Sequence, residues 1–381
     1  VFTLDPLFHA GVYYVQDASS MYLEPLIKKY VSSPSIVLDL CAAPGGKSTH
    51  LSAILPEDSL LVSNEVIRSR ANILMENLIK WGRPDTIIIN NDPSEIAVSQ
   101  RFFDVIVADV PCSGEGMFRK DPKSNQEWSP ENVKLCAERQ KRIIADIWPA
   151  LKPGGILIYS TCTYNKRENE ENLDWISRRL GAELLEEPRR LMPHQVKGEG
   201  FFIAALRKTA EEGKSSASAV SKKTNRLKNE SKLPIPQEVK KYLLNAEKFS
   251  VINDDHTIKA VPTKYRTHYE LLKRLNILNV GISLAKVKGK DIIPLHSLAM
   301  SVELNPSAFP VLEMSKEDAL RYLRKESTFE IPTNLPKGYV LVCYQGNPLG
   351  FIKNIGNRIN NLYPNEWRIR MQIPGENVSG G

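Results

Sequence analysis

Residues 35–48 read Ser-Ile-Val-Leu-Asp-Leu-Cys-Ala-Ala-Pro-Gly-Gly-Lys-Ser, and this stretch decides the fold. The apolar run Ile36–Leu40 is typical of a strand buried on both faces. It leads directly into the glycine-containing loop 41–47, and the pattern from Ser48 onward is helical. Glycines let backbone N–H groups approach a ligand closely at a helix N-terminus. The stretch therefore predicts a strand, a ligand-binding loop and a helix.

Three other interpretations of this loop compete with that one. A triphosphate-binding P-loop shares the tail Gly46-Lys47-Ser48, but it requires glycine where Cys41 stands. A dinucleotide site requires the pattern Gly-x-Gly-x-x-Gly, which this loop lacks. A glycine-rich turn that binds nothing remains as the third alternative.

The chain from residue 35 to about residue 206 alternates short β-branched runs with amphipathic stretches, which is typical of βαβ units. The expected strands are Ile36–Leu40, Leu60–Asn64, Thr86–Asn90, Val105–Ala108, Ile156–Ser160 and Gly200–Leu206. The expected helices include Val66–Trp81 and Val133–Ala150. The fold class is therefore α/β, a doubly wound, Rossmann-like parallel sheet, followed by a smaller α+β region.

Changes in composition divide the chain further. Residues 1–207 form the expected sheet domain, with 1–34 as its lead-in, and the Ser- and Lys-rich segment 208–232 reads as a flexible linker. A small α+β connecting domain is expected over 233–285 and a second module over 286–381. In the second module, the run Tyr339–Tyr344 followed by a Gly- and Pro-containing turn predicts a hairpin.

The bulk composition narrows the class of protein. The chain has 381 residues, a net charge of +7 and five cysteines without disulfide or metal-site spacing. We expect a globular, cytoplasmic protein with reduced thiols, no metal and no membrane span, acting as a monomer on a polyanion such as nucleic acid. Because the chain does not begin with Met, a segment before Val1 is also expected.

Three carboxylates follow successive strands of the expected sheet. Glu65 follows the second strand, where a carboxylate can accept hydrogen bonds from both ribose hydroxyls of an adenosine ligand. Asp92 follows the third strand and could orient the adenine, or it could simply close an Asx-turn. Asp109 ends the fourth strand and faces the crevice where ligands bind in such sheets. Together the three carboxylates suit an adenosine ligand that carries a sulfonium group, and Arg70 is a further candidate contact to that ligand.

Two cysteines also lie at strand ends. Cys112 follows the fourth strand in Asp-Val-Pro-Cys-Ser-Gly, and Cys162 follows the fifth in Ser-Thr-Cys-Thr-Tyr. Either thiol alone would most simply be a small buried hydrophobe. As a pair on adjacent strands they point to chemistry over one crevice, whereas Cys136 and Cys343 lie on a helix and in a strand and read as structural.

Further motifs give the chain a family resemblance. The segments Asp17–Met21, Gly114–Asp121 and Gly200–Ala204, combined with Pro-Cys-Ser-Gly and Thr-Cys, resemble the Sun/nucleolar-protein family of RNA cytosine-5 methyltransferases. Within that family the chain is most similar to the bacterial RsmF-type ribosomal RNA enzymes. The resemblance implies S-adenosylmethionine bound by residues 41–47, a PUA-like RNA-binding module over about 286–371, and rRNA of the small subunit as substrate.

The resemblance also assigns roles at the site. It makes Cys162 the nucleophile and Cys112 the thiol that assists product release, with Asp109 holding the cytosine and Lys47 neutralising nearby carboxylates. The chemistry is consistent, because carbon 5 of cytosine is a poor nucleophile until a thiolate adds to carbon 6. In DNA cytosine-5 methyltransferases the Pro-Cys cysteine is the nucleophile, so Cys162 favours RNA. The alternatives are transfer RNA as substrate and a noncatalytic ribosome-assembly factor.

Basic and aromatic residues suggest where RNA is gripped. Arg119, Lys120 and Lys123 follow the Cys112 loop and could grip the strand beside the target base, with Trp128 stacking on a base. A solvated basic loop is the equal alternative. In the last module, charge and stacking surface are expected from Lys353, Arg358, Arg368 and Arg370 with Tyr363 and Trp367. A chain that ends at Lys232 is therefore expected to lose RNA affinity and keep its cofactor affinity.

Overall fold

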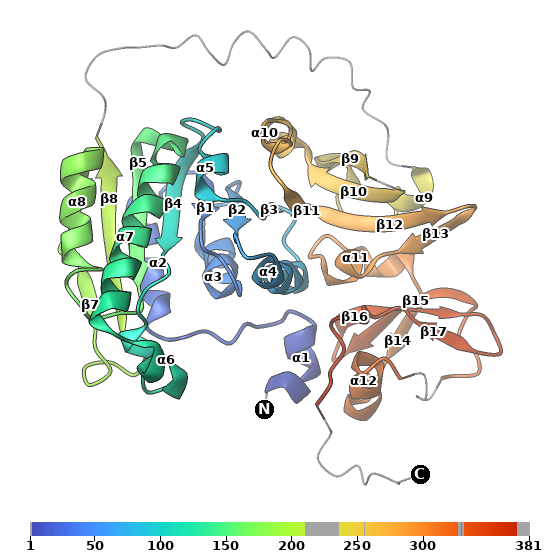
Figure 1. Ribbon diagram of the computed structural model, residues 1–381. Helices are drawn as coiled ribbons and strands as arrows, with labels where there is room; N and C mark the ends of the chain where they lie inside the picture. Colours follow the sequence, from blue (N-terminus) through green and yellow to red (C-terminus); the bar gives the residue numbers. More distant parts are fainter. Residues whose placement is uncertain (1, 210–235, 255, 327–328, 330, 372–381) are drawn as a thin grey trace.

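The computed structural model describes residues 2–209, 236–254, 256–326, 329 and 331–371. Over these residues the strands form one large mixed sheet and two four-stranded sheets (Figure 1). No helix in these ranges is both long and apolar enough to cross a membrane. The segment 208–232, expected to be a linker, lies outside the described residues apart from Lys208 and Thr209.

The large sheet has a parallel centre, as the sequence predicts. Its parallel strands, in order across the sheet, are β3 (Thr86–Ile89), β2 (Leu60–Asn64), β1 (Ile36–Asp39), β4 (Phe103–Asp109) and β5 (Leu151–Thr161). Strand order reverses direction at β1, so a crevice opens beyond the carboxyl ends of β1 and β4. Antiparallel strands follow β5: β8 (Phe201–Lys208), with β6 (Ala182–Leu184) and β7 (Arg189–Leu191) paired to it.

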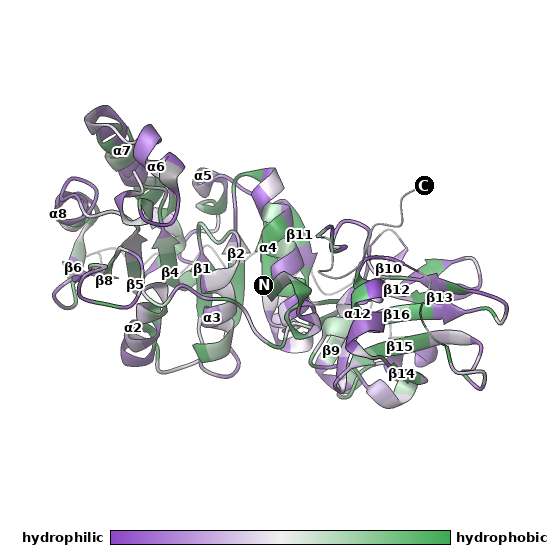
Figure 2. Ribbon diagram, turned by 90° about the horizontal axis from the view of Figure 1, so that it is seen from below, coloured by the Kyte–Doolittle hydropathy of each residue, from purple (hydrophilic) through white to green (hydrophobic). Residues whose placement is uncertain are grey.

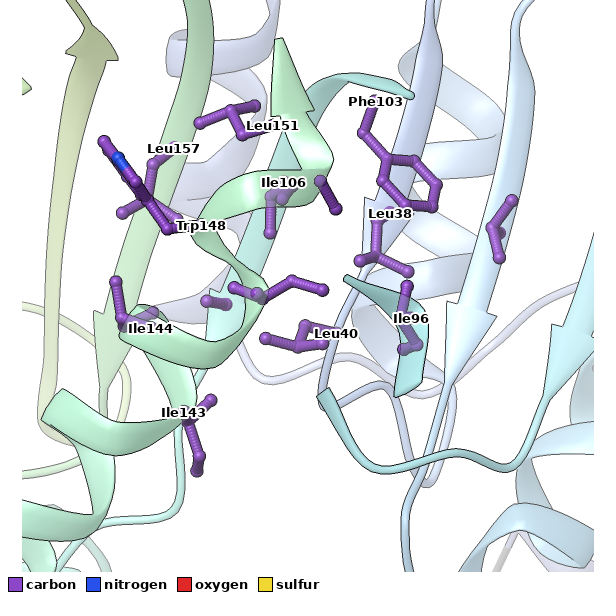
Figure 3. Close-up of a cluster of buried hydrophobic side chains, with 14 of the residues drawn as sticks. Leu38, Leu40, Ile96, Phe103, Ile106, Ile143, Ile144, Trp148, Leu151 and Leu157 are labelled. Carbon is purple, nitrogen blue, oxygen red and sulfur yellow. The ribbon is translucent and has the colours of Figure 1, made fainter. Parts of the chain in front are cut away.

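Helices cover both faces of this sheet because successive strand residues point to opposite sides. One face is covered by α2 (Leu23–Tyr30), α3 (Gly46–Ile54) and α4 (Arg68–Trp81), the other by α5 (Pro93–Ile96), α7 (Pro130–Ile147) and α8 (Glu170–Leu180). Val37 of β1 packs with Leu51 of α3. Its neighbour Leu38 packs in the opposite core, which Ile143 and Ile144 of α7 also enter (Figure 3).

Two smaller sheets follow the large one. The first, in the order β13-β12-β10-β9, consists of β9 (Phe249–Asp254), β10 (Thr257–Pro262), β12 (Ile282–Lys288) and β13 (Asp291–Pro294). The second consists of β14 (Val311–Glu313), β15 (Gly338–Tyr344), β16 (Asn347–Asn354) and β17 (Ile359–Asn361), and β15–β16 is the hairpin that the sequence predicts. The expected boundary at residue 285 falls inside β12, so the first sheet spans it. The accompanying helices are α9 (Gln237–Lys240), α10 (Arg266–Leu272), α11 (His296–Met300) and α12 (Lys316–Leu323).

One strand from the later part of the chain joins the large sheet. β11 (Ile277–Val280) pairs antiparallel with β3, and the Asn276 N–H donates to Asn91 Oδ1 at 3.0 Å. Val280 and Leu272 belong to the same hydrophobic core as Leu38. The sheet domain is therefore completed by residues that lie beyond the expected linker, which a pattern read along the chain does not reveal.

The N-terminal helix α1 (Pro6–His9) lies at the junction between the large sheet and the C-terminal sheets (Figures 1 and 2). It contacts α12 and β16, and Leu4 and Ala10 pack against the core of the last module. The chain then runs from this junction toward the carboxyl ends of the parallel strands. The lead-in therefore reaches both the last module and the crevice. The remaining short helix, α6 (Pro122–Glu127), follows the Cys112 loop.

Candidate active site

The loop after β1 is shaped for close approach of a ligand. Gly45 has a φ of 116°, a conformation that favours glycine, and it caps the N-terminus of α3. A Cβ on Gly46 would lie 3.1 Å from Gln16 Oε1. Arg70 donates to the Ala43 carbonyl at 2.9 Å and Asn77 to the Pro44 carbonyl at 2.8 Å. The backbone of residues 42–46 is thereby held in place before any ligand binds.

The carboxylates expected near the cofactor differ in their surroundings. Glu65 is buried at the end of β2, and its Oε1 accepts a hydrogen bond from the Ile67 N–H at 2.9 Å while Arg70 lies 3.4 Å from Oε2. Asp92 caps α5 by accepting from the Ser94 N–H at 3.1 Å, which is the Asx-type role that the sequence allows. Cys41 is half-buried, packs against the main core and does not line the cavity described below.

Beneath the loop, Asp39 is completely buried at the end of β1. Its Oδ2 accepts a hydrogen bond from Ser48 Oγ at 2.6 Å, whereas nothing among the described residues hydrogen-bonds Oδ1. Burial raises the pKa of Asp39 to about 7, and the Ser48 hydroxyl opposes that rise. This carboxyl group therefore titrates close to neutral pH.

The two candidate reactive cysteines are in direct contact. Cys112 Sγ lies 2.9 Å from Cys162 Sγ, and the Cys162 N–H donates to Cys112 Sγ at 3.3 Å. Adjacency of β4 and β5 brings them together, as the sequence predicts. The hydrogen bond to Cys162 and burial raise the pKa of the Cys112 thiol well above its usual value. By contrast, Cys136 and Cys343 are buried in α7 and β15, and burial raises the pKa of Cys343 to about 12.

Lys47 and Asp109 form an ion pair beside these thiols. Lys47 Nζ lies 2.8 Å from Asp109 Oδ2, and Ser160 Oγ donates to the other carboxylate oxygen at 2.7 Å. Although burial is the largest effect and opposes the charge, the pKa of Lys47 is raised because Asp109 pairs with it. The ammonium group therefore stays positive in the crevice.

A cavity of about 330 Å³ lies over these groups. Its walls come from the cofactor loop, the ends of β4 and β5, the start of β8 and the N-terminal lead-in. The lining residues are Tyr14, Val15, Gln16, Asp17, Ser20, Ala42, Ala43, Pro44, Gly46, Lys47, Asp109, Met117, Lys120, Cys162, Glu199, Gly200 and Phe201. Of the two contacting thiols, Cys162 lines this cavity and Cys112 does not. A reactant in the cavity would therefore meet Cys162 first.

Sequence reasoning missed part of this wall. Tyr14 and Gln16 belong to a segment with no distinctive pattern, and Gln16 donates to the Gly46 carbonyl at 2.6 Å. Glu199 directly precedes the recognised Gly200–Ala204 motif, and the Phe201 ring lies 5.3 Å from Lys47 Nζ. The position of Glu199 beside a motif is the one signal that could have identified it.

The basic residues after the Cys112 loop divide into two groups. Lys120 is exposed and lines the cavity, consistent with a contact to a bound strand. Arg119 instead pairs with Glu199 at 3.1 Å. Trp128 Nε1 donates to Glu115 Oε1 at 3.0 Å, although the ring stays partly exposed.

In the last module, the expected RNA-binding residues differ in how exposed they are and in whether their charge is already paired. Arg358, Arg368 and Arg370 are exposed. Lys353 Nζ lies 2.5 Å from Asp291 Oδ2, so its charge is already paired. The expectation that Tyr363 offers a stacking surface is wrong, because its side chain is fully buried in the module's core. Trp367 is partly buried, and Lys80 Nζ lies 5.3 Å from its ring.

Two protein-family models match this chain. The model described as 16S rRNA methyltransferase RsmB/F matches residues 31–207, and the model described as methyltransferase RsmF PUA domain matches residues 309–369. The first covers the large sheet except β11, and the second covers β14–β17 with α12. The second match begins after the first small sheet, downstream of the expected start at 286.

Curated relatives are similar over nearly the whole chain. Ribosomal RNA small subunit methyltransferase F of Salmonella arizonae is 31% identical over 94% of this chain and 78% of the relative. The protein of the same name from Shewanella amazonensis is 29% identical over 94% of this chain and 80% of the relative. Among solved structures, NSun6 from Pyrococcus horikoshii with SFG is 28% identical, with a TM-score of 0.49, over 54% of this chain and 55% of that one.

Proposed function

The chain belongs to the RsmB/F family of 16S rRNA methyltransferases, and from this premise we propose that it methylates carbon 5 of a cytosine in small-subunit rRNA. S-adenosylmethionine is the methyl donor. The reaction proceeds through a covalent bond between Cys162 and carbon 6 of the base. The observation that carries this proposal is the contact between Cys162 and Cys112 at the wall of a cavity that Lys47 and Asp109 also line or adjoin.

The residues around the cavity fit the methyl donor. Backbone groups of residues 42–46 approach at the N-terminus of α3, where Gly46 leaves the space that a Cβ would fill. Glu65 does not line this cavity but directly follows β2, where a carboxylate can hold ribose hydroxyls. When bound, S-adenosylmethionine supplies an electrophilic methyl group on a sulfonium centre.

Cys162 begins the reaction. Its Sγ, as the thiolate, forms a bond to carbon 6, and the electrons of the 5,6 double bond make carbon 5 nucleophilic enough to take the methyl group. Lys47 places a positive charge near this thiolate. Asp109, held by Lys47 and Ser160, is positioned to hydrogen-bond the cytosine ring. The target base must leave its stack to reach the cavity, so flanking nucleotides lie on the surface near Lys120.

Cys112 completes the reaction. Once Cys162 is bonded to the base, Cys112 loses its proton to solvent and then, as the thiolate, takes the proton on carbon 5. The electrons of that C–H bond restore the 5,6 double bond, and the bond between carbon 6 and Cys162 breaks with its electron pair returning to Cys162 Sγ. Cys162 is then again the thiolate with which the reaction began and Cys112 is again a thiol, so one proton is released to solvent per methyl group transferred.

The direct test is methyl transfer in vitro. The purified chain is incubated with methyl-labelled S-adenosylmethionine and either small-subunit rRNA, the assembled small subunit or transfer RNA. We expect label as 5-methylcytosine in one of the two rRNA samples, located by bisulfite sequencing. Label in transfer RNA would identify the rival substrate, and no label in any sample would support the noncatalytic assembly factor.

A further inference from the structure

Glu168 is a fully buried carboxylate in the turn that leads into α8. Its Oε2 accepts hydrogen bonds from the Ser113 N–H at 3.0 Å and from Gln140 Nε2 at 2.7 Å. Its Oε1 accepts from Ser113 Oγ at 2.5 Å and from Asn165 Nδ2 at 2.7 Å. Every one of these contacts uses the group as an acceptor, which is how an ionised carboxylate behaves.

Two of these donors, Ser113 and Asn165, belong to the segments that carry the two cysteines. Ser113 directly follows Cys112, and Asn165 lies on the loop that begins at Cys162. Asn165 also accepts the Glu168 N–H through Oδ1 at 2.9 Å. One carboxylate therefore fixes both loops relative to each other, and a shift in either loop would change the distance between the sulfurs.

The charge of Glu168 is also unusual. Among the residues that the structure describes, the hydrogen-bond partners of this carboxylate are all neutral, and Gln140, its partner on α7, is fully buried. A buried charge without an opposite charge acts over a longer range than a solvated one. The hydrogen bond to Cys162 and burial raise the pKa of Cys112, and the field of Glu168 adds to that rise. The proton therefore stays on Cys112 while Cys162 awaits the base.

We propose that Glu168 is a positioning residue for the release step, acting through Ser113 and Asn165 to hold the protonated Cys112 thiol against Cys162. This inference rests on the two-cysteine reaction proposed above. Glu168 touches neither the base nor the methyl donor in this role. Its effect is to delay proton loss from Cys112 until the covalent bond at Cys162 has formed.

The test is Glu168→Gln, which keeps the shape and removes the charge. A carboxamide also presents an N–H₂ group to donors that require an acceptor. We expect the first-turnover methyl transfer to fall less than about tenfold. Resolution of the covalent complex should slow by about 100-fold, because Cys112 is no longer held in position to take the proton on carbon 5. The pH dependence of resolution should move to lower pH, because Cys112 loses its proton more readily without the nearby charge.

Two further variants separate positioning from simple structural support. Glu168→Asp keeps the charge, so its pH profile should stay with that of the unmodified chain even if its rates are lower. Glu115→Gln is the matched control, because Glu115 also bridges the loops by accepting from Thr163 Oγ1 and the Tyr164 N–H, each at 2.9 Å. It should leave the pH profile in place.

Each outcome has one meaning. An unshifted pH profile for Glu168→Gln, or equal slowing of methyl transfer and resolution, would overturn the positioning role while leaving the proposed reaction intact. If Glu168→Gln does not fold, a shifted profile for Glu168→Asp would equally overturn the role, and an unshifted one supports it. Failure of the unmodified chain to form any covalent complex with RNA would remove the proposed reaction itself.

Discussion

Cys112 and Cys162 face each other across adjacent strand ends with 2.9 Å between their Sγ atoms, and the Cys162 N–H donates to Cys112 Sγ. Two contacts therefore link the residues, one between the sulfurs and one from the Cys162 backbone. Of the two thiols, only Cys162 lines the cavity. This asymmetry distinguishes the thiol that a substrate meets from the thiol that supports it.

The first prediction separates the two thiols. Cys162→Ala should form no covalent complex with RNA, because no thiol remains among the residues that line the cavity. Cys112→Ala should form the complex and resolve it about 100- to 10,000-fold more slowly, since a general base is lost. Denaturing gel electrophoresis with labelled RNA measures both. A gel-stable complex from Cys162→Ala and none from Cys112→Ala would reverse the assignment.

The strands of the large sheet and the two thiols of the candidate site could be predicted from short patterns in the sequence. The apolar run at Ile36–Leu40 and the thiols after neighbouring strands need only strand periodicity and the rule that parallel strands end at one edge. Contacts between distant segments could not be predicted from local patterns. β11 pairs with β3 although the two strands are far apart in the sequence, and Gln16, which hydrogen-bonds the Gly46 carbonyl, belongs to a segment without a distinctive pattern. Tyr363 lies between Arg358 and Arg368 in the sequence, yet in the fold its side chain is buried in the core.

The second prediction concerns truncation. The sequence predicts that a chain ending at Lys232 keeps its cofactor affinity, but such a chain would lack β11. The absence of β11 exposes the edge of β3, and the cut also removes Leu272 and Val280 from the main core. Losing a buried leucine alone costs about 2–5 kcal/mol, a large part of typical stability. We expect the truncated chain to aggregate or melt far below the full chain and to lose cofactor affinity, as measured by circular dichroism and calorimetry. A fragment that melts within a few degrees of the full chain would show β11 to be dispensable.

The third prediction uses the titration of Asp39. Its pKa of about 7 in the folded chain exceeds its ordinary value of 3.8, so the folded state retains a proton that the unfolded state has lost. The contribution of this group to stability is complete below the unfolded pKa and disappears as pH rises through about 7, with a slope of up to about 1.4 kcal/mol per pH unit. Urea unfolding between pH 4 and 8 should show this loss in the unmodified chain and a flatter profile in Asp39→Asn. If the free energy of unfolding changes with pH in the same way in the unmodified chain and in Asp39→Asn, the raised pKa of Asp39 is contradicted.

The fourth prediction follows from the sulfur contact. Hydrogen peroxide should oxidise one thiol to a sulfenic acid, which the second thiol attacks with loss of water to give a disulfide. Activity and two titratable thiols should disappear together, and dithiothreitol should restore both. Cys112→Ser is the control, because its Cys162 has no neighbouring thiol and its oxidation should proceed further and become irreversible. Peroxide inactivation that dithiothreitol fails to reverse in the unmodified chain would exclude this disulfide.

The fifth prediction tests the last module as an RNA-binding surface. Arg358 and Arg368 are exposed there, whereas the charge of Lys353 is paired with Asp291. Each phosphate contact that is lost should reduce the slope of log affinity against log salt by about 0.7–0.9. Arg358→Gln and Arg368→Gln should therefore each weaken binding of small-subunit rRNA and flatten its salt dependence.

Lys353→Gln is the matched control for these two variants. It also removes one positive charge from the same module, but that charge is already paired with the Asp291 carboxylate. Its salt slope should change less than that of either arginine variant. Affinity for the methyl donor should stay constant in all three, since none of these residues lines the cavity. If the slope of log affinity against log salt is the same in the arginine variants as in the unmodified chain, these arginines do not contact RNA. The exposed Lys120, which lines the cavity, would then be the next residue to replace.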